Sequence, residues 1–378
     1  MRVSRNKRTS EKSLPKVAVI GSVGVPGIYG GFETLAENLV RFNTTRDKPV
    51  DLTVYCSNSA YKEHPLFFMG ARLVYMPLKA NGIQSIPYDI LSMISAAWKR
   101  HDQLLVLGVS GCLFLPVIKL FSRIHVVTNV DGIEWRREKW KGLAKQFLRL
   151  SERLAVRYSD VVIADNKSIA EYLFDVYECR SQVIAYGGDH ALVSSPAPID
   201  DLALPKKFAL GLSRIEPENN VDMILDSFSK NPTERLVFVG NWDASPYGRS
   251  LRATYTRYAN IDLVDPVYEA GRLRSLRDRA WLYVHGHSAG GTNPSLVEMM
   301  HFNIPVVAFD CRFNRHSTKN QALFFATPEE LQKCVSKLHL EGNCEEIGNC
   351  MQAIARDKYN WASIGKAYFE LIGATYED

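Results

Sequence analysis

The residues best suited to chemistry lie in one stretch, GTNPSLVE at positions 291–298, between two apolar runs that predict buried strands. A glycine turn that leads into a helix exposes N–H groups without backbone partners and the positive end of the helix dipole. Such a helix start binds phosphate. The residues expected to contact the phosphates of a bound nucleotide-sugar donor here are Gly290, Gly291, Thr292 and Asn293. Glu298 lies one to two turns into the helix, where its carboxylate can reach a ribose hydroxyl. The stretch therefore predicts a site for a sugar nucleotide.

A second glycine pair, Gly30-Gly31, follows the first predicted strand and precedes a helix. Glycine lets the backbone approach a ligand closely, so this pair is expected to contact a donor diphosphate from the first half of the chain. The alternative is a purely structural turn. The glycine spacing from Gly21 onward does not match a dinucleotide fingerprint, and no acid stands clearly about 20 residues later, which argues against NAD.

Asp131, Glu134, Trp135 and Arg136 follow a third predicted strand, 125–128. Acids at the junction of a strand and a loop often perform acid–base chemistry, and an indole can stack on a sugar face. We therefore expect Asp131 to be catalytic and the other three to bind the acceptor. The alternative for Asp131 is a cap of the following segment.

Arg214 follows another predicted strand and is expected to offset diphosphate charge in the leaving group. The alternative is a surface salt bridge to Glu216 or Glu218, which contributes little energy. His285 and His287 have no Asp or Cys at ligand spacing, and the chain contains no D-x-D, so no metal site is predicted. We expect His287 to hydrogen-bond the donor instead.

Short apolar runs alternate with helical stretches along the chain, which predicts two doubly wound α/β domains with parallel sheets. A Pro-, Ser- and Asp-rich segment at 191–205 reads as the linker. We expect a basic disordered tail at 1–15 and domains at 16–195 and 196–355. A last helix within 356–378 is expected to pack back on the first domain. Ligands of such sheets bind at the carboxyl ends of the strands, here in an interdomain cleft.

The composition of the chain limits the classes of partner and the cellular compartment that we expect. The 378 residues carry a net charge of +5, without the dense basic stripe of a nucleic-acid binder. The seven cysteines are scattered, which favours free thiols over a disulfide framework. The first residues lack the apolar core of a secretory signal, and no apolar run is long enough to span a bilayer. A basic helix near 141–158, flanked by Trp135 and Trp140, predicts contact with an anionic membrane or a solvated face.

Four motifs together resemble the bacterial GT-B rhamnosyltransferases of the family-4 type, which build capsule and O-antigen polysaccharides. They are GGFET at 30–34, DGIEW at 131–135, RIEPENN at 214–220 and GTNPSLVE at 291–298. The resemblance extends from about Lys16 to Tyr368. It implies a GT-B fold, two Rossmann-like domains facing a cleft and a metal- and cofactor-independent retaining transfer. It also implies dTDP-rhamnose as donor and a polyprenyl-diphosphate-linked saccharide as acceptor, at the cytoplasmic face of the plasma membrane.

The resemblance also implies roles for residues: Glu298 would hold the donor ribose, Arg214 the diphosphate, and Asn219 and Gly290 would line the donor site. Two departures stand out. Gly290 replaces a glutamate that the broader family has eight residues before Glu298, and Asn219 replaces a lysine five positions after the arginine. Lys319 or Arg312 are alternative bases for the diphosphate. The rival hypotheses are a UDP- or GDP-sugar transferase, a sugar-nucleotide epimerase, a non-catalytic sugar-nucleotide-binding protein and a dinucleotide-dependent dehydrogenase.

Overall fold

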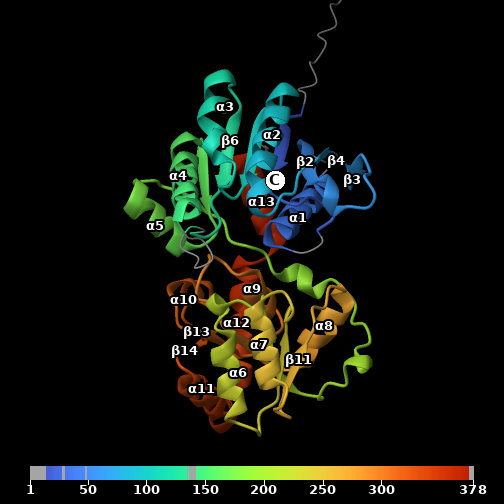
Figure 1. The fold of residues 1–378 in the computed structure, drawn as a ribbon, viewed down its shortest axis with the longest axis vertical. Helices are drawn as coiled ribbons and strands as arrows, with labels where there is room; N and C mark the ends of the chain where they lie inside the picture. Colours follow the sequence, from blue (N-terminus) through green and yellow to red (C-terminus); the bar gives the residue numbers. More distant parts are fainter. Residues whose placement is uncertain (1–13, 28–29, 47–48, 134, 136–141, 374–378) are drawn as a thin grey trace, which may run out of the picture.

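The computed structural model describes residues 14–27, 30–46, 49–133, 135 and 142–373. Its two lobes are each built around one sheet (Figure 1). In the described residues the N-terminal sheet has eight strands in the order β3-β4-β2-β1-β5-β6-β7-β8, and all pairs are parallel except β3 with β4. The strands are β1 (Lys16–Ile20), β2 (Asp51–Ser57), β3 (Phe67–Phe68), β4 (Ala71–Met76), β5 (Gln103–Leu107), β6 (His125–Asn129), β7 (Val161–Ala164) and β8 (Gln182–Val183).

Helices cover both faces of this sheet because each crossover between parallel strands passes over one face. They are α1 (Gly31–Thr45), α2 (Ser85–Trp98), α3 (Leu115–Phe121), α4 (Gly142–Tyr158) and α5 (Lys167–Tyr177). The central strands β1, β2, β5, β6 and β7 are mostly buried and rich in Val, Ile and Leu, as expected for a parallel sheet between helices, whereas the edge strands β3 and β8 are largely exposed.

The C-terminal sheet is wholly parallel in the described residues, with six strands in the order β11-β10-β9-β12-β13-β14. The strands are β9 (Phe208–Leu212), β10 (Leu236–Val239), β11 (Ile261–Val264), β12 (Ala280–His285), β13 (Val306–Phe309) and β14 (Leu323–Phe325). The helices are α6 (Val221–Ser229), α7 (Pro246–Tyr255), α8 (Ala270–Arg279), α9 (Pro294–Met300), α10 (Arg312–Ser317), α11 (Pro328–Glu341) and α12 (Cys344–Lys358).

The last helix, α13 (Trp361–Leu371), returns to the N-terminal domain (Figure 1). The Phe369 ring lies 5.2 Å from that of Phe42 on α1, and the Tyr368 hydroxyl accepts a 2.6 Å hydrogen bond from the side chain of Asn129. The C-terminal domain thus ends with α12, and the chain crosses back at residues 359–360, a few positions after the expected boundary at 356.

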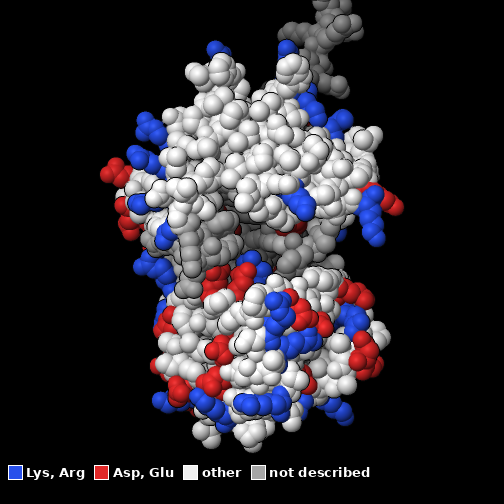
Figure 2. Space-filling model, in the orientation of Figure 1, with Lys and Arg blue, Asp and Glu red and all other residues white. Residues whose placement is uncertain are grey.

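This arrangement confirms the prediction of two doubly wound domains that face each other. Figure 2 shows the surface hollowed between the two lobes. No helix in the described part of the chain is long and apolar enough to cross a membrane. All seven cysteines are free thiols.

Candidate active site between the two domains

Glycine loops of the two domains meet at the carboxyl ends of their strands. Gly31, at the start of α1, lies where an added Cβ would be 3.6 Å from the ring of Pro294, the first residue of α9. Gly132, after β6, lies where a Cβ would be 3.0 Å from the Cα of Gly290. A side chain at Gly132 would require the facing backbone to shift by a few tenths of an ångström, whereas a Cβ at Gly31 would make an ordinary van der Waals contact. The structure therefore brings together three of the segments that the sequence marks as functional.

Gly290 has a backbone conformation that L-residues rarely adopt, with φ at 120°. A Cβ built on it would meet no atom within 4 Å, so this part of the loop borders open space. Strain of this kind costs a non-glycine residue about 1–3 kcal/mol. The missing carboxylate at this position thus fits a loop whose backbone requires glycine.

Asp165, which follows β7, joins the two domains and was not singled out from the sequence. Its carboxylate accepts a 2.9 Å hydrogen bond from the N–H of Thr292, and the Thr292 hydroxyl donates to its carbonyl oxygen at 2.5 Å. A Cβ on Gly291 would lie 1.8 Å from the same carboxylate. The Thr292 amide, expected to face a phosphate, is therefore bound to Asp165 in this conformation. The signal that marks Asp131, an acid directly after a buried strand, marks Asp165 equally.

Asp131 and Asp165 form a pair of acids at the ends of the adjacent strands β6 and β7. Burial, and then the negative charge of Asp131, raises the pKa of Asp165 well above its usual range, although the hydrogen bond from Thr292 opposes this. Asp131 lies in the left-handed region, with φ at 51°, and its N–H donates to the side chain of Asn129 at 2.8 Å. One carboxyl of the pair is thus suited to hold a proton beside a carboxylate.

Glu298 lies on α9 and is held by the protein's own groups. Its carboxylate pairs with the buried guanidinium of Arg277 and lies 3.2 Å from the Nε2 atom of His190. Burial alone would raise the pKa of Glu298, but Arg277 and His190 outweigh it and lower that pKa below its usual value. Glu298 is therefore a carboxylate.

The tautomer of His190 follows from its other ring nitrogen. The indole N–H of Trp361 donates to His190 Nδ1 at 2.9 Å, so the proton of a neutral imidazole is on Nε2, facing Glu298. His190 lies in the segment between the domains, and Trp361 begins α13. Glu298, the residue expected to bind the donor ribose, is thus linked to both segments of the chain that pass between the domains. His190 belongs to the first of these segments, and Trp361 lies at the end of the second.

Arg214 lies after β9 and is half exposed, with its guanidinium 3.6 Å from Glu216. Asn219 is buried, and its side-chain N–H donates to the carbonyl of Arg214 at 2.8 Å. Asn219 therefore shapes the loop that presents Arg214. The side chain of Asn220 donates to Gly286 at 2.8 Å, which ties this loop to the one after β12.

The two histidines after Val284 stack on each other, with ring centroids 4.4 Å apart and an angle of 12° between the planes. Burial lowers the pKa of His285 to about 3, so that ring is neutral at physiological pH. His287 is half-buried, and its carbonyl accepts from Asn314 at 2.9 Å. Among the described residues, no three His, Cys, Asp or Glu side chains lie together as metal ligands would.

Of the three residues expected to bind the acceptor, the structure describes only Trp135. Glu134 and Arg136 lie outside the described residues. Trp135 is described, and its indole N–H donates to the buried Glu152 at 3.2 Å, while Lys145 and Arg149 approach the ring to 5.5 Å. Trp135 therefore packs against α4, a role that was not expected from the sequence.

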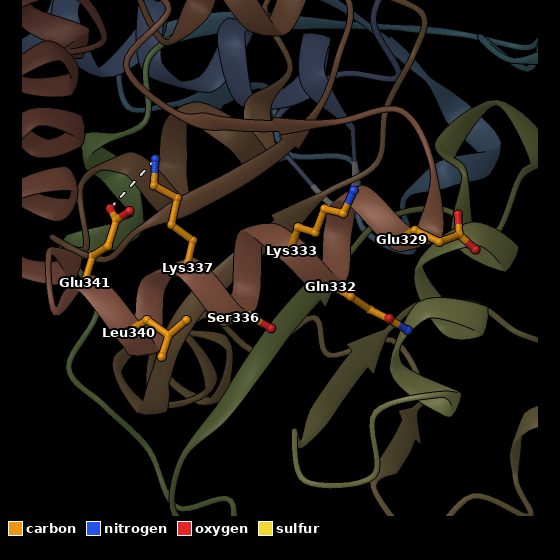
Figure 3. A pocket seen from close by; sticks show the side chains of 7 residues that line it. All are labelled: Glu329, Gln332, Lys333, Ser336, Lys337, Leu340 and Glu341. Atoms are coloured by element: carbon orange, nitrogen blue, oxygen red, sulfur yellow. Dashed lines mark ion pairs between the residues drawn. The ribbon is translucent and has the colours of Figure 1, made fainter.

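A separate surface groove of about 430 Å³ lies far from these loops, along the exposed side of α11 (Figure 3). One helix supplies all of its lining residues, and Lys337 pairs with Glu341 across it at 3.8 Å. It lacks the convergent polar groups of a ligand site.

Comparison with known proteins agrees with this architecture. Residues 199–351 match the family described as Glycosyl transferases group 1, and residues 14–189 match the Domain of unknown function DUF1972. A search of curated proteins finds no match.

Solved structures of similar fold cover almost the whole chain. A sucrose-phosphate synthase from Thermosynechococcus elongatus is 12% identical, with a TM-score of 0.79, and the match covers 96% of this chain and 100% of that one. HepE of Anabaena, solved in complex with UDP-glucose, is 17% identical, with a TM-score of 0.74, over 95% and 99% of the two chains. A putative UDP-N-acetylglucosamine 2-epimerase from Listeria monocytogenes is 12% identical, with a TM-score of 0.64, over 96% of each chain.

The fold and the match of the C-terminal domain define the class of protein: a glycosyltransferase with GT-B architecture. The candidate site residues of the C-terminal domain are Arg214, Gly290 and Glu298, and those of the N-terminal domain are the glycines before α1 and the two acids Asp131 and Asp165.

Proposed function

We propose that the protein transfers L-rhamnose from dTDP-rhamnose, with retention of configuration, to a saccharide linked to a polyprenyl diphosphate. The observation that carries the site assignment is the close approach of the two domains at Gly31 and Pro294 and at Gly132 and Gly290, where an added Cβ on Gly31 or Gly132 would lie 3.6 Å or 3.0 Å from the other domain. The four motifs that resemble bacterial rhamnosyltransferases support the choice of sugar. The reaction is proposed to need no cofactor and no metal.

In the proposed reaction the bond between the sugar C1 and the diphosphate breaks, and an acceptor oxygen bonds to C1 on the same face. The acceptor proton goes to the leaving diphosphate. Arg214 and the backbone N–H groups around Gly30 and Gly31 oppose the charge that develops on that group, and one such oriented donor contributes about 3 kcal/mol. Asp131 orients the acceptor hydroxyl or stabilises positive charge on the sugar.

Glu298 is proposed to hold the donor ribose through the oxygen that faces His190. When the donor binds, the His190 ring would then either release the Glu298 carboxylate or share it with the ribose hydroxyl. The second residue of the acid pair, Asp165, is proposed to position the loop at Thr292 while the domains are closed.

A UDP-sugar donor is the second candidate, because the similar HepE structure is a complex with UDP-glucose. We further propose that the enzyme works at the cytoplasmic face of the plasma membrane, in contact with anionic lipid, because a lipid-linked acceptor must reach the cleft from a bilayer. The basic helix α4 supports this location, with Arg149, Arg153 and Arg157 among its side chains.

The donor is tested by thermal unfolding of the purified protein with dTDP-rhamnose, UDP-glucose, UDP-N-acetylglucosamine, GDP-mannose or NADH, without metal. Ligand at about 100 times Kd stabilises a protein by about 2.7 kcal/mol. A selective rise in Tm with dTDP-rhamnose supports the proposal. A rise in Tm with a different sugar nucleotide would identify that compound as the donor in place of dTDP-rhamnose. A rise in Tm with NADH alone refutes the proposed function. Turnover of a sugar nucleotide without an acceptor would indicate an epimerase.

A further inference from the structure

The helices α2 and α3 present an unusual outer surface. Every position of α2 that is exposed carries an apolar residue, and these positions are Pro87, Leu91, Ile94 and Trp98. The same holds for α3, whose exposed positions are Val117, Leu120 and Phe121. A surface helix normally places charged or polar residues on its outer side. We call these seven side chains the α2–α3 patch.

The exposed fractions are large. Trp98 is 87% exposed, Phe121 81% and Leu120 76%. Ile83, just before α2, extends the apolar row toward the cleft end of the helix and is 86% exposed. Figure 2 shows most of the surface over these two helices in white, without red Asp or Glu atoms, whereas the C-terminal domain is densely charged. A contiguous apolar surface of this kind marks an interaction site.

Basic residues adjoin the patch at one end. Each helix ends in an aromatic residue followed by basic ones: Trp98-Lys99-Arg100 ends α2, and Phe121-Ser122-Arg123 ends α3. A pocket lined by Arg100 and Arg123, among others, shows that the two helix ends lie side by side. Asp102 lines the same pocket and accepts the backbone N–H of Lys16 at 2.8 Å, so the two arginines outnumber the single acid that lines this pocket.

We infer that the α2–α3 patch inserts into an anionic membrane, with Trp98 and Phe121 at the boundary between headgroups and acyl chains. Apolar insertion beside basic residues is the pattern of interfacial membrane binding, and Trp is favoured at that boundary. Lys99, Arg100 and Arg123 complement the charge of anionic headgroups. A protein partner is less favoured, because the exposed positions of the two helices offer no polar group to fix its orientation.

This inference deepens the proposed function, on which it rests for the lipid-linked acceptor. It assigns the main membrane contact to α2 and α3, whereas the sequence analysis assigned it to the basic helix. Because the apolar row runs from Trp98 toward Ile83 at the cleft end of α2, a bilayer on this face would lie alongside the mouth of the cleft. An acceptor could then enter without leaving the membrane.

The test is flotation of the full-length protein with vesicles of phosphatidylcholine, or of phosphatidylcholine with 30% phosphatidylglycerol. The variant is Trp98→Ser/Phe121→Ser, and the matched control is Leu340→Ser, at an apolar residue on the C-terminal domain that is equally exposed, at 86%. We expect binding to the anionic vesicles, a loss of tenfold or more in the double variant, and no change in the control. Since all three side chains are exposed, each variant should keep the wild-type Tm.

Equal binding by the double variant and the wild type, or no vesicle binding at all, overturns the inference. Light scattering that shows a dimer dissociated by the double variant, without vesicle binding, would assign the patch to a second copy of the chain. Donor binding separates this test from the proposed function. A Tm rise with sugar nucleotide but no vesicle binding refutes only the membrane surface, and vesicle binding without any donor response refutes only the proposed function.

Discussion

At the scale of single residues, Glu298 shows how a residue can serve both stability and ligand binding. Its carboxylate neutralises Arg277, which is nearly fully buried. Breaking a buried ion pair by removing one partner costs far more than replacing both. A loss of activity in a Glu298 variant would therefore not by itself identify a ribose contact.

We predict that Glu298→Gln lowers the free energy of unfolding by about 3–5 kcal/mol, because the charge of Arg277 is left uncompensated. The double variant Arg277→Met/Glu298→Gln should recover most of this loss in urea unfolding. If it does, and the donor no longer raises its Tm, the ribose role is separated from the structural one. A single variant that loses less than about 1 kcal/mol would contradict the importance of the pair.

Asp89 provides a second prediction at this scale. It is buried on α2, and burial raises its pKa to about 8, against which the hydrogen bond from the Gly111 backbone acts only partly. The folded protein therefore keeps the proton that the unfolded chain loses near pH 4. Its contribution to stability is complete below that pH and is lost as the pH rises toward 8, by at most about 1.4 kcal/mol per unit.

Asp89→Asn should remove this dependence and raise the free energy of unfolding at pH 7, because the amide is neutral at every pH and still accepts from Gly111. Urea unfolding at pH 5, 6, 7 and 8 measures it, with the exposed Asp175→Asn on α5 as control. A slope unchanged from the wild type would show that Asp89 is ionised in the folded protein.

At the scale of elements, α9 is capped by Asn293, a residue that the sequence led us to expect in contact with the donor. The side chain of Asn293 accepts the N–H of Ser295 at 3.1 Å and its hydroxyl at 2.8 Å. Both bonds use the amide oxygen, which an aspartate would also supply. Asn and Asp are comparable as N-caps, and Ala is poorer by about 1 kcal/mol.

We predict that Asn293→Ala loses about 1 kcal/mol of stability while Asn293→Asp stays close to the wild type. Donor titration of the Asp variant then tests the ligand role. If the amide nitrogen contacts a phosphate, the added negative charge weakens donor binding in a protein that remains fully stable. Unchanged affinity would assign Asn293 to the cap alone.

At the scale of the whole molecule, polar contacts among the described residues join the two domains beside the candidate site. Asp165 binds the amide of Thr292, and the side chain of Asn166 donates to Phe313 and Ser317 on α10. These contacts join the segment directly after β7 to the loop after β12 and to α10. Closure of this kind excludes water and completes an active site.

Asp165→Ala should widen the cleft, because it leaves the Thr292 amide without its acceptor. We expect a larger radius of gyration in solution scattering without donor, and a transfer rate about 100-fold lower, as for a misplacement near 1 Å. Asp160→Asn is the control, since Asp160 accepts from Lys119 and Val126 within the N-terminal domain. An Asp165→Ala variant with wild-type dimensions and rate would refute this role in closure.

The sequence by itself determined the two α/β domains and most of the loops around the site. Glycine pairs before helices, and acids or arginine directly after buried strands, indicate those loops because the ends of parallel strands share one edge of a sheet. This is why the sequence alone marks Gly31, Asp131, Arg214 and Gly290 as candidate site residues. The same signal would have found Asp165.

Only the tertiary structure decided which of these groups are available to a ligand. Asn219 and Trp135 turn inward to the Arg214 carbonyl and to Glu152, and Glu298 meets an arginine 21 positions earlier in the chain. Thr292 meets an acid 127 residues away in the other domain. Hydrogen bonds and ion pairs between residues so far apart leave no periodic trace, because they depend on how closely packed helices and loops approach one another. The apolar outer face of α2 could not be recognised from the sequence for the same reason. A row of apolar residues on a helix is normally interpreted as the buried face, and only the structure shows that the sheet packs against the opposite face of α2.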